Sequence, residues 1–173
     1  MGPYVHLGLP YPGDNQLAGV AQDGAVRLHG TVYDGAGDGV PDALVEISQP
    51  GPDGRMIRRE GSLQRDGATF TGWGRCATDA AGHYSFSTLS PGAAAGRAAY
   101  FAIVVFARGL LNRLFTRAYL PDSDLAADRL LSTLDASRRQ TLICAADEEG
   151  YRFDVHLQGV KETVFLAYRG NSR

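Results

Sequence analysis

The chain has 173 residues, a mass of 18.5 kDa, 44% hydrophobic and 21% charged residues, and a formal net charge of -2. These values are typical of one globular domain and give no reason to expect a nucleic acid or an anionic membrane as partner. The longest apolar run, 98–107, is about half of the ~20 residues that a membrane-spanning helix needs, and the first residues lack the features of a secretory signal. The two cysteines are far apart in the sequence, and we interpret them as reduced thiols. Together these features predict a cytoplasmic protein.

Residues 1–24 are rich in glycine and proline and show no periodicity, so we interpret them as an irregular amino-terminal arm. The pattern changes at about residue 25, and we expect the rest of the chain, 25–173, to form one β-sandwich domain. Eight segments have the alternation or the short apolar runs of strands. These predicted strands are 26–33, 40–49, 69–78, 83–89, 98–107, 113–119, 151–158 and 162–167. The segment 98–107 is apolar on both faces, which predicts a central strand of a covered sheet.

Turn signals and one helical region separate these strands. A turn rich in aspartate and glycine covers 34–39, and a long polar excursion covers 50–67. Only the interval 123–146 has a helical pattern, because its leucines recur with a spacing near 3.6 residues. Within it, Asp135 or Ser137 is a candidate cap for a second short helix. The fold class predicted is mainly β, an antiparallel β sandwich with one short helical region near 123–146.

Three segments, taken in order, resemble the intradiol ring-cleaving dioxygenases. They are Leu28–Gln49, which contains His-Gly-Thr-Val-Tyr-Asp-Gly, then Gly74–Gly92, and then Tyr151–Gly159. Members of that family are non-haem Fe(III) enzymes that use O₂ to open a catechol between its two hydroxyls. The resemblance therefore implies a β sandwich of the intradiol dioxygenase type and an oxidoreductase function.

Four further stretches narrow this resemblance to heteromeric members of the family. They are Gly2–Gly8, Phe106–Gly109, Arg138–Ile143 and Glu162–Phe165. Such enzymes are built from homologous alpha and beta chains, and the alpha chain does not hold the iron. The resemblance implies a homologous iron-binding beta subunit as partner, a higher αβ oligomer, and an aromatic small molecule and O₂ as substrates.

The family holds Fe(III) with two tyrosinates and two histidines, and this chain lacks them at the matching positions. The His-x-His pair of the central strand corresponds to Tyr100 and Ala102, and the tyrosinate that follows the Pro-Gly turn corresponds to Ala94. The second tyrosinate comes from the excursion before Gly74, but no tyrosine occurs between residues 34 and 83. The four histidines are single and dispersed, and we interpret them as surface or edge residues. We therefore expect no metal and no catalytic residue in this chain, with Fe(III) held by the beta partner.

The resemblance implies that this chain shapes the substrate cavity of its partner. In the heteromeric enzymes the amino-terminal Gly-Pro-Tyr lines that cavity, which here corresponds to Gly2, Pro3 and Tyr4. Arg108 corresponds to an arginine near the cavity mouth, where a guanidinium orients a substrate carboxylate. The isolated chain is then expected to be inactive.

Interpretations that give the same residues no role in a functional site stay open. The arm can be a frayed terminus, and Arg108 can be a solvated arginine at the end of a strand. Arg138 and Arg139 are expected on a solvated or inter-subunit helix face. For the whole chain, the alternatives are a stand-alone sandwich module that binds a ligand without catalysis and a purely structural subunit.

Overall fold

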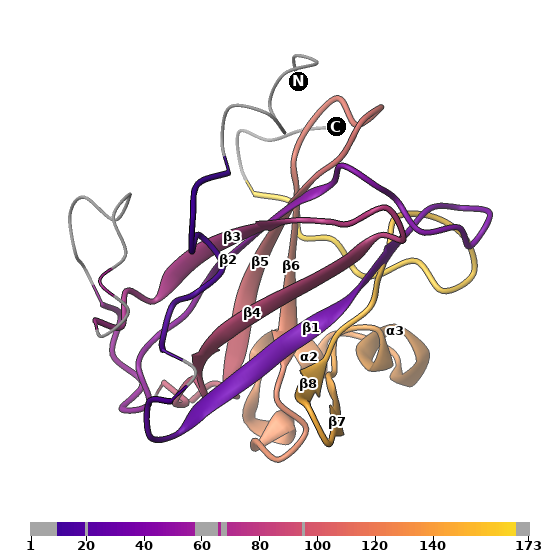
Figure 1. The fold of residues 1–173 in the computed structure, drawn as a ribbon. Helices are drawn as coiled ribbons and strands as arrows, with labels where there is room; N and C mark the ends of the chain where they lie inside the picture. Colours follow the sequence, from indigo (N-terminus) through magenta and orange to yellow (C-terminus); the bar gives the residue numbers. More distant parts are fainter. Residues whose placement is uncertain (1–9, 20, 58–65, 67–68, 95, 169–173) are drawn as a thin grey trace.

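The computed structural model describes residues 10–19, 21–57, 66, 69–94 and 96–168, and it arranges them in two β-sheets that pack face to face (Figure 1). The first sheet has the order β4 (His83–Leu89), β1 (Ala25–Tyr33), β8 (Gly150–Arg152) and β7 (Ala145–Asp147), with β9 (Val155–His156) also paired to β1. The second has the order β3 (Trp73–Ala77), β2 (Leu44–Ser48), β5 (Tyr100–Phe106) and β6 (Leu114–Tyr119). The prediction of a mainly β sandwich is confirmed.

Alternation of side chains along each strand builds the core between the sheets. In β5, Phe101, Ile103 and Val105 are almost completely buried, whereas the residues between them are half-buried. The prediction that this strand is covered on both faces therefore holds only for the inner one. The outer face of the second sheet is apolar along β5 but only partly covered within this chain.

The pairing of the strands differs from the predicted antiparallel arrangement beside β1. All contacts of the second sheet are antiparallel, but β8 and β9 both run parallel to β1. Parallel neighbours need a long connection between them, and the chain between β1 and β8 passes through the whole second sheet. The sandwich is therefore mixed.

The C-terminal part of the chain departs furthest from the predicted strands. The segment 151–158 splits into β8 and β9. Asp154 lies between the two strands, and its side chain accepts a hydrogen bond from the Thr31 backbone amide at 3.0 Å, which interrupts the backbone pairing. The segment 162–167 is extended but is not a strand. It contacts the sheet at single hydrogen bonds, such as that from the Leu166 amide to the Phe115 carbonyl. The short strand β7 was not predicted.

The helical region consists of three short pieces, η1 (Leu125–Ala127), α2 (Arg129–Ser132) and α3 (Ala136–Gln140). An aspartate begins each piece by accepting backbone amide hydrogens with its side chain. These residues are Asp124, Asp128 and Asp135. Because each capping aspartate begins a new helix, the segment with the predicted leucine periodicity forms three short helices and not one long helix. In the part of the chain that the structure describes, no helix has the length and hydropathy of a membrane-spanning segment.

The two arginines of α3 bind carbonyl groups. Arg138 donates to the carbonyl of Glu162 at 2.6 Å, and Arg139 donates to the carbonyls of Leu131 and Leu134 at 3.0 and 3.2 Å. Both side chains are half-buried within this chain, so they are not fully solvated, and the alternative prediction of an inter-subunit helix face stays a prediction. The two side chains hold the helical region together.

We expect Leu131→Ala to destabilise the protein by about 3 kcal/mol, because Leu131 is fully buried against Tyr119 and Leu142 and its removal leaves a cavity. Val160→Ala is the matched control, because Val160 is fully exposed and its truncation should change stability by less than about 0.5 kcal/mol. Urea unfolding monitored by circular dichroism measures both variants. Equal midpoints would show that the helical region does not unfold together with the sheets.

Candidate functional site

The positions that correspond to the family's histidine ligands lie on the outer face of the second sheet. Tyr100 and Ala102 alternate with the buried residues of β5, and they pair across the strands with Tyr119 and Arg117 of β6. Ala102 offers only a methyl group. The Arg117 side chain lies across this part of the surface, with its guanidinium carbon 4.4 Å from the centre of the Tyr100 ring. A cation stacked on an aromatic ring therefore stands at the positions that the sequence resemblance matches to the metal ligands.

Arg117 is also the first member of a chain of hydrogen bonds. Its guanidinium donates to the Tyr119 hydroxyl at 3.0 Å, and that hydroxyl donates to the Asp128 carboxylate at 3.0 Å. Asp128 is almost fully buried and also accepts the backbone amide hydrogens of Leu130 and Leu131 at 2.9 and 3.3 Å. The chain of hydrogen bonds thus connects the outer face of the sheet to the start of α2.

The charges along these hydrogen bonds are set by burial and by the bonds themselves. Burial raises the pKa of Tyr119 to about 12, although the Arg117 guanidinium acts in the opposite direction. Burial is the largest single effect on Arg117 and disfavours its charge, but the hydrogen bond to Tyr119 and the phenol groups of Tyr119, Tyr100 and Tyr168 together outweigh it and raise the Arg117 pKa. Tyr119 is therefore a neutral phenol that donates to Asp128, and Arg117 is a permanent cation.

These residues do not fit Fe(III). Tyr100 would be the only donor at the positions of the histidine pair, and the guanidinium on its ring repels another cation. Ala94 is exposed and has no ligating atom. The Asp128 carboxylate is already engaged by Tyr119 and the α2 backbone. Among the described residues, no group of three or more histidine, cysteine, aspartate or glutamate side chains is placed to hold a metal ion.

Arg108 lies just beyond the other end of β5, in the hairpin that leads to β6. Its side chain is 78% exposed, and one guanidinium nitrogen forms an ion pair with the Asp42 carboxylate at 2.6 Å. The length of β5 separates it from Tyr100 by roughly 20 Å. The structure therefore does not bring Arg108 and the metal-equivalent positions together. The other predicted cavity residues, Gly2, Pro3 and Tyr4, lie outside the described residues.

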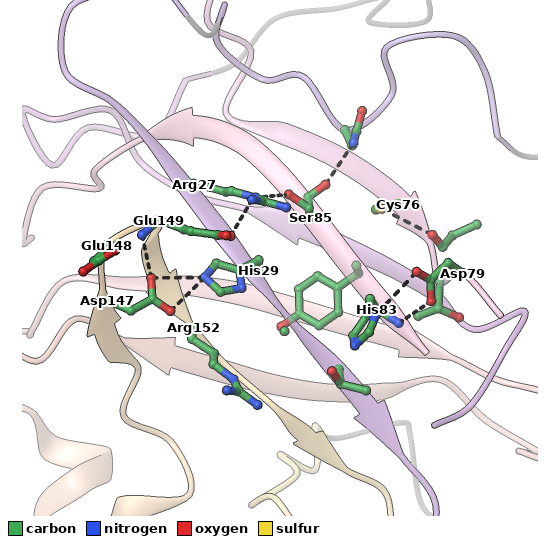
Figure 2. Close-up of a pocket in the computed structure, with 16 residues that line it drawn as sticks. Arg27, His29, Cys76, Asp79, His83, Ser85, Asp147, Glu148, Glu149 and Arg152 are labelled. Carbon is green, nitrogen blue, oxygen red and sulfur yellow. Dashed lines mark hydrogen bonds and ion pairs between the residues drawn. The ribbon is translucent and has the colours of Figure 1, made fainter. Parts of the chain in front are cut away.

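A polar groove of about 940 Å³, which the sequence did not predict, crosses the outer face of the first sheet (Figure 2). Strand β1 contributes Arg27 and His29, and the β7–β8 hairpin contributes Asp147 and Glu149. Figure 2 shows Arg27 paired with Glu149 and His29 paired with Asp147. Because these partners lie more than a hundred residues apart in the chain, no local motif could have indicated the groove.

The histidines of this groove are engaged separately. His29 Nε2 lies 3.1 Å from an Asp147 oxygen, and His83 Nδ1 lies 3.4 Å from an Asp79 oxygen. In Figure 2 the two pairs lie on opposite sides of the groove. Each carboxylate also accepts backbone amide hydrogens, Asp147 from those of residues 149 and 150 and Asp79 from those of residues 81 and 83. Each histidine therefore has its own carboxylate partner, which favours a structural role for both histidines.

Comparisons with known proteins agree with the geometry of the sheets. A family model described as "Dioxygenase" matches residues 13–159. The alpha chain of protocatechuate 3,4-dioxygenase from Burkholderia cepacia is 38% identical over 151 residues, which cover 82% of this chain and 76% of that protein. The beta chain of the enzyme with the same name from the same organism is 34% identical over 153 residues, covering 78% and 64%.

Similarity among solved structures shows the fold alone. The dioxygenase domain of a dioxygenase–carbohydrate-binding fusion protein from Streptomyces sp. SirexAA-E superposes with a TM-score of 0.63. It is 22% identical, and the match covers 84% of this chain and 88% of that domain. The predicted sandwich of the intradiol dioxygenase type is thereby confirmed.

We expect acid to destabilise the protein partly through Asp147. Burial acts to raise its pKa, but the His29 contact and the backbone amides outweigh this and hold the pKa below the ordinary 3.8. The stabilisation is therefore complete above pH 3.8 and is lost as the pH falls through the lower value of the folded state. Asp147→Asn should make the loss of stability below that pH less steep, as measured by urea unfolding across pH. Glu148→Gln, which changes the adjacent carboxylate outside the His29 pair, should retain the wild-type slope.

Proposed function

The chain belongs to the intradiol ring-cleavage dioxygenase family, and we propose that it is the non-iron-binding alpha subunit of a protocatechuate 3,4-dioxygenase. The observation that carries the proposal is the Arg117 guanidinium stacked on Tyr100 beside Ala102, in a chain with this fold. A family member whose own metal position has become a cation–aromatic contact needs a second chain for catalysis. Similarity to both an alpha and a beta chain supports a homologous partner.

The proposed reaction is the O₂-dependent cleavage of 3,4-dihydroxybenzoate to 3-carboxy-cis,cis-muconate in the cavity of the beta subunit. Fe(III) held by that partner supplies the redox chemistry. This chain contributes walls and substrate recognition, with Gly2, Pro3 and Tyr4 lining the cavity. Glycine and proline permit close and rigid backbone approach, and a tyrosine presents an aromatic face with a hydroxyl donor. The proposal places the enzyme in the cytoplasm, where the free thiols Cys76 and Cys144 stay reduced.

Arg108 is the residue that we assign to the carboxylate of the substrate. It is exposed, it lies in the β5–β6 hairpin, and its ion pair with Asp42 engages one of its guanidinium nitrogens. An exposed ion pair is worth about 0–1 kcal/mol, so its release from Asp42 costs little. A bidentate contact with a carboxylate in a dry cavity is stronger. Arg108 is therefore suited to exchange Asp42 for substrate.

The Arg108–Asp42 pair also favours the second candidate, a purely structural subunit. If the pair persists in the assembled enzyme, Arg108 fixes the hairpin against the turn before β2 and does not contact substrate. The two candidates differ in what the removal of Arg108 does to substrate affinity.

We expect Arg108→Ala in the assembled enzyme to raise KM for protocatechuate by about 10-fold or more, because a hydrogen bond to a charged group contributes about 1.5–3 kcal/mol. The kcat should change much less, because Arg108 does not contact the reacting ring carbons. Arg129→Ala, which removes an exposed arginine from α2, is the control and should retain wild-type kinetics. Steady-state kinetics measure both variants. An unchanged KM in Arg108→Ala would remove Arg108 from the site and favour the structural subunit.

We expect the tagged chain, purified from its native host, to bring with it a homologous chain in equal amount. The complex should contain iron and show a visible tyrosinate-to-Fe(III) absorption band, whereas the chain expressed alone should be colourless and inactive. Metal analysis and absorption spectroscopy measure this. A lone, iron-free chain would favour a stand-alone binding module. A lone chain with iron would show that it binds the metal without the family's ligand residues at positions 94, 100 and 102, and would overturn the proposal.

A further inference from the structure

The hairpin between β5 and β6 carries a large apolar side chain that the described part of the chain leaves uncovered. Residues 107–113 form this hairpin, and Leu111 at its tip is 92% exposed. In Figure 1 the hairpin projects beyond the ends of both sheets. We propose that this hairpin tip anchors the chain to the homologous iron-bearing subunit, with Leu111 entering an apolar pocket of that subunit. The proposal rests on the proposed function and extends it to the means of assembly.

The exposure of Leu111 results from the way the hairpin is built. Leu110 packs against the core, and its amide donates to the Ala107 carbonyl at 3.2 Å, which closes the turn. Gly109 has a φ of +87°, a left-handed conformation that glycine adopts without strain. With Leu110 turned inward, Leu111 points away from the sandwich. The apolar tip is therefore presented on a defined turn, and little conformational entropy is lost when it is buried.

The surface next to the tip contains the arginine and aromatic side chains that are typical of hot spots in protein–protein interfaces. Arg113 stacks on Phe115 with its guanidinium carbon 5.2 Å from the ring centre, and Tyr168, which is half-exposed, meets the same ring edge-on at 5.1 Å. Arginine and aromatic residues are the types that dominate the binding energy of protein interfaces. Arg113, Phe115 and Tyr168 contact one another and follow Leu111 at the tip, and we call these four residues the hairpin surface.

Charge indicates the chemistry of the partner. The segment 107–119 contains three arginines and no carboxylate. A complementary surface is therefore an apolar pocket with carboxylates on its rim. A second copy of this chain is a poor partner for the hairpin surface, because a two-fold contact would place the same arginines against one another. The surface fits a different chain.

The position of Arg108 identifies that chain. Three residues span at most about 10 Å, so a subunit that Arg108 reaches lies within reach of Leu111 as well. If Arg108 binds substrate in the cavity of the iron-bearing subunit, that subunit is the nearest partner for Leu111. Anchoring the tip also fixes Arg108 at the cavity mouth.

The test compares Leu111→Asp with Val160→Asp in chains co-expressed with the iron-bearing subunit. Both substitutions place a carboxylate on a fully exposed apolar residue, so both variants should fold and unfold like the wild type. We expect Leu111→Asp to weaken assembly at least 10-fold, as measured by titration of the purified chains and by the iron that co-purifies. Val160→Asp should assemble normally, because Val160 lies by α3, away from the hairpin. Leu111→Met should restore assembly by providing an apolar side chain of similar volume.

Each outcome decides the proposal. Normal assembly of Leu111→Asp overturns the anchor and leaves the proposed function intact. Failure of the wild-type chain to bind an iron-bearing homologue overturns the proposed function and the anchor together. A wild-type homodimer that Leu111→Asp dissociates overturns our choice of partner. Loss of assembly in Leu111→Asp alone, with rescue by Leu111→Met, supports it.

Discussion

The antiparallel register between β5 and β6 is the constraint on which the rest of the molecule depends. It places Arg117 opposite Ala102 and Tyr119 opposite Tyr100, so a guanidinium covers the ring at the positions matched in sequence to the family's metal ligands. The turn that joins the same two strands carries Arg108 and Leu111. One pair of strands therefore presents the positions matched to the metal ligands at one end and the proposed contacts with the partner at the other.

Arg117 connects the elements around this surface. Here the guanidinium contacts the Tyr100 ring and donates to Tyr119, which in turn donates to the buried Asp128 at the start of α2. A permanent cation and a chain of hydrogen bonds connect β5, β6 and the helical region. Burial raises the pKa of Tyr119 to about 12, so Tyr119 is a neutral phenol in this chain of hydrogen bonds.

Sequence patterns were reliable where one local rule decides the outcome. Alternation located β4 at His83–Leu89 and put Tyr84 and Phe86 on its buried face, because burial of one face imposes a period of two. The patterns failed where partners are distant. The parallel pairing of β1 with β8 and the extended path of 162–168 depend on which backbone groups meet across the fold. Alternation is the same in a paired strand and in an unpaired extended segment.

The sequence by itself determined the family, the number of sheet-forming segments to within a few, and the absence of nitrogen ligands at positions 100 and 102. The identity of a residue fixes which chemical groups are present at its position. Only the tertiary structure decided which groups meet: Arg117 with Tyr100, Arg108 with Asp42, and His29 with Asp147, 118 residues away. Such contacts depend on strand register and on long-range packing, and the local pattern of apolar and polar residues does not encode either.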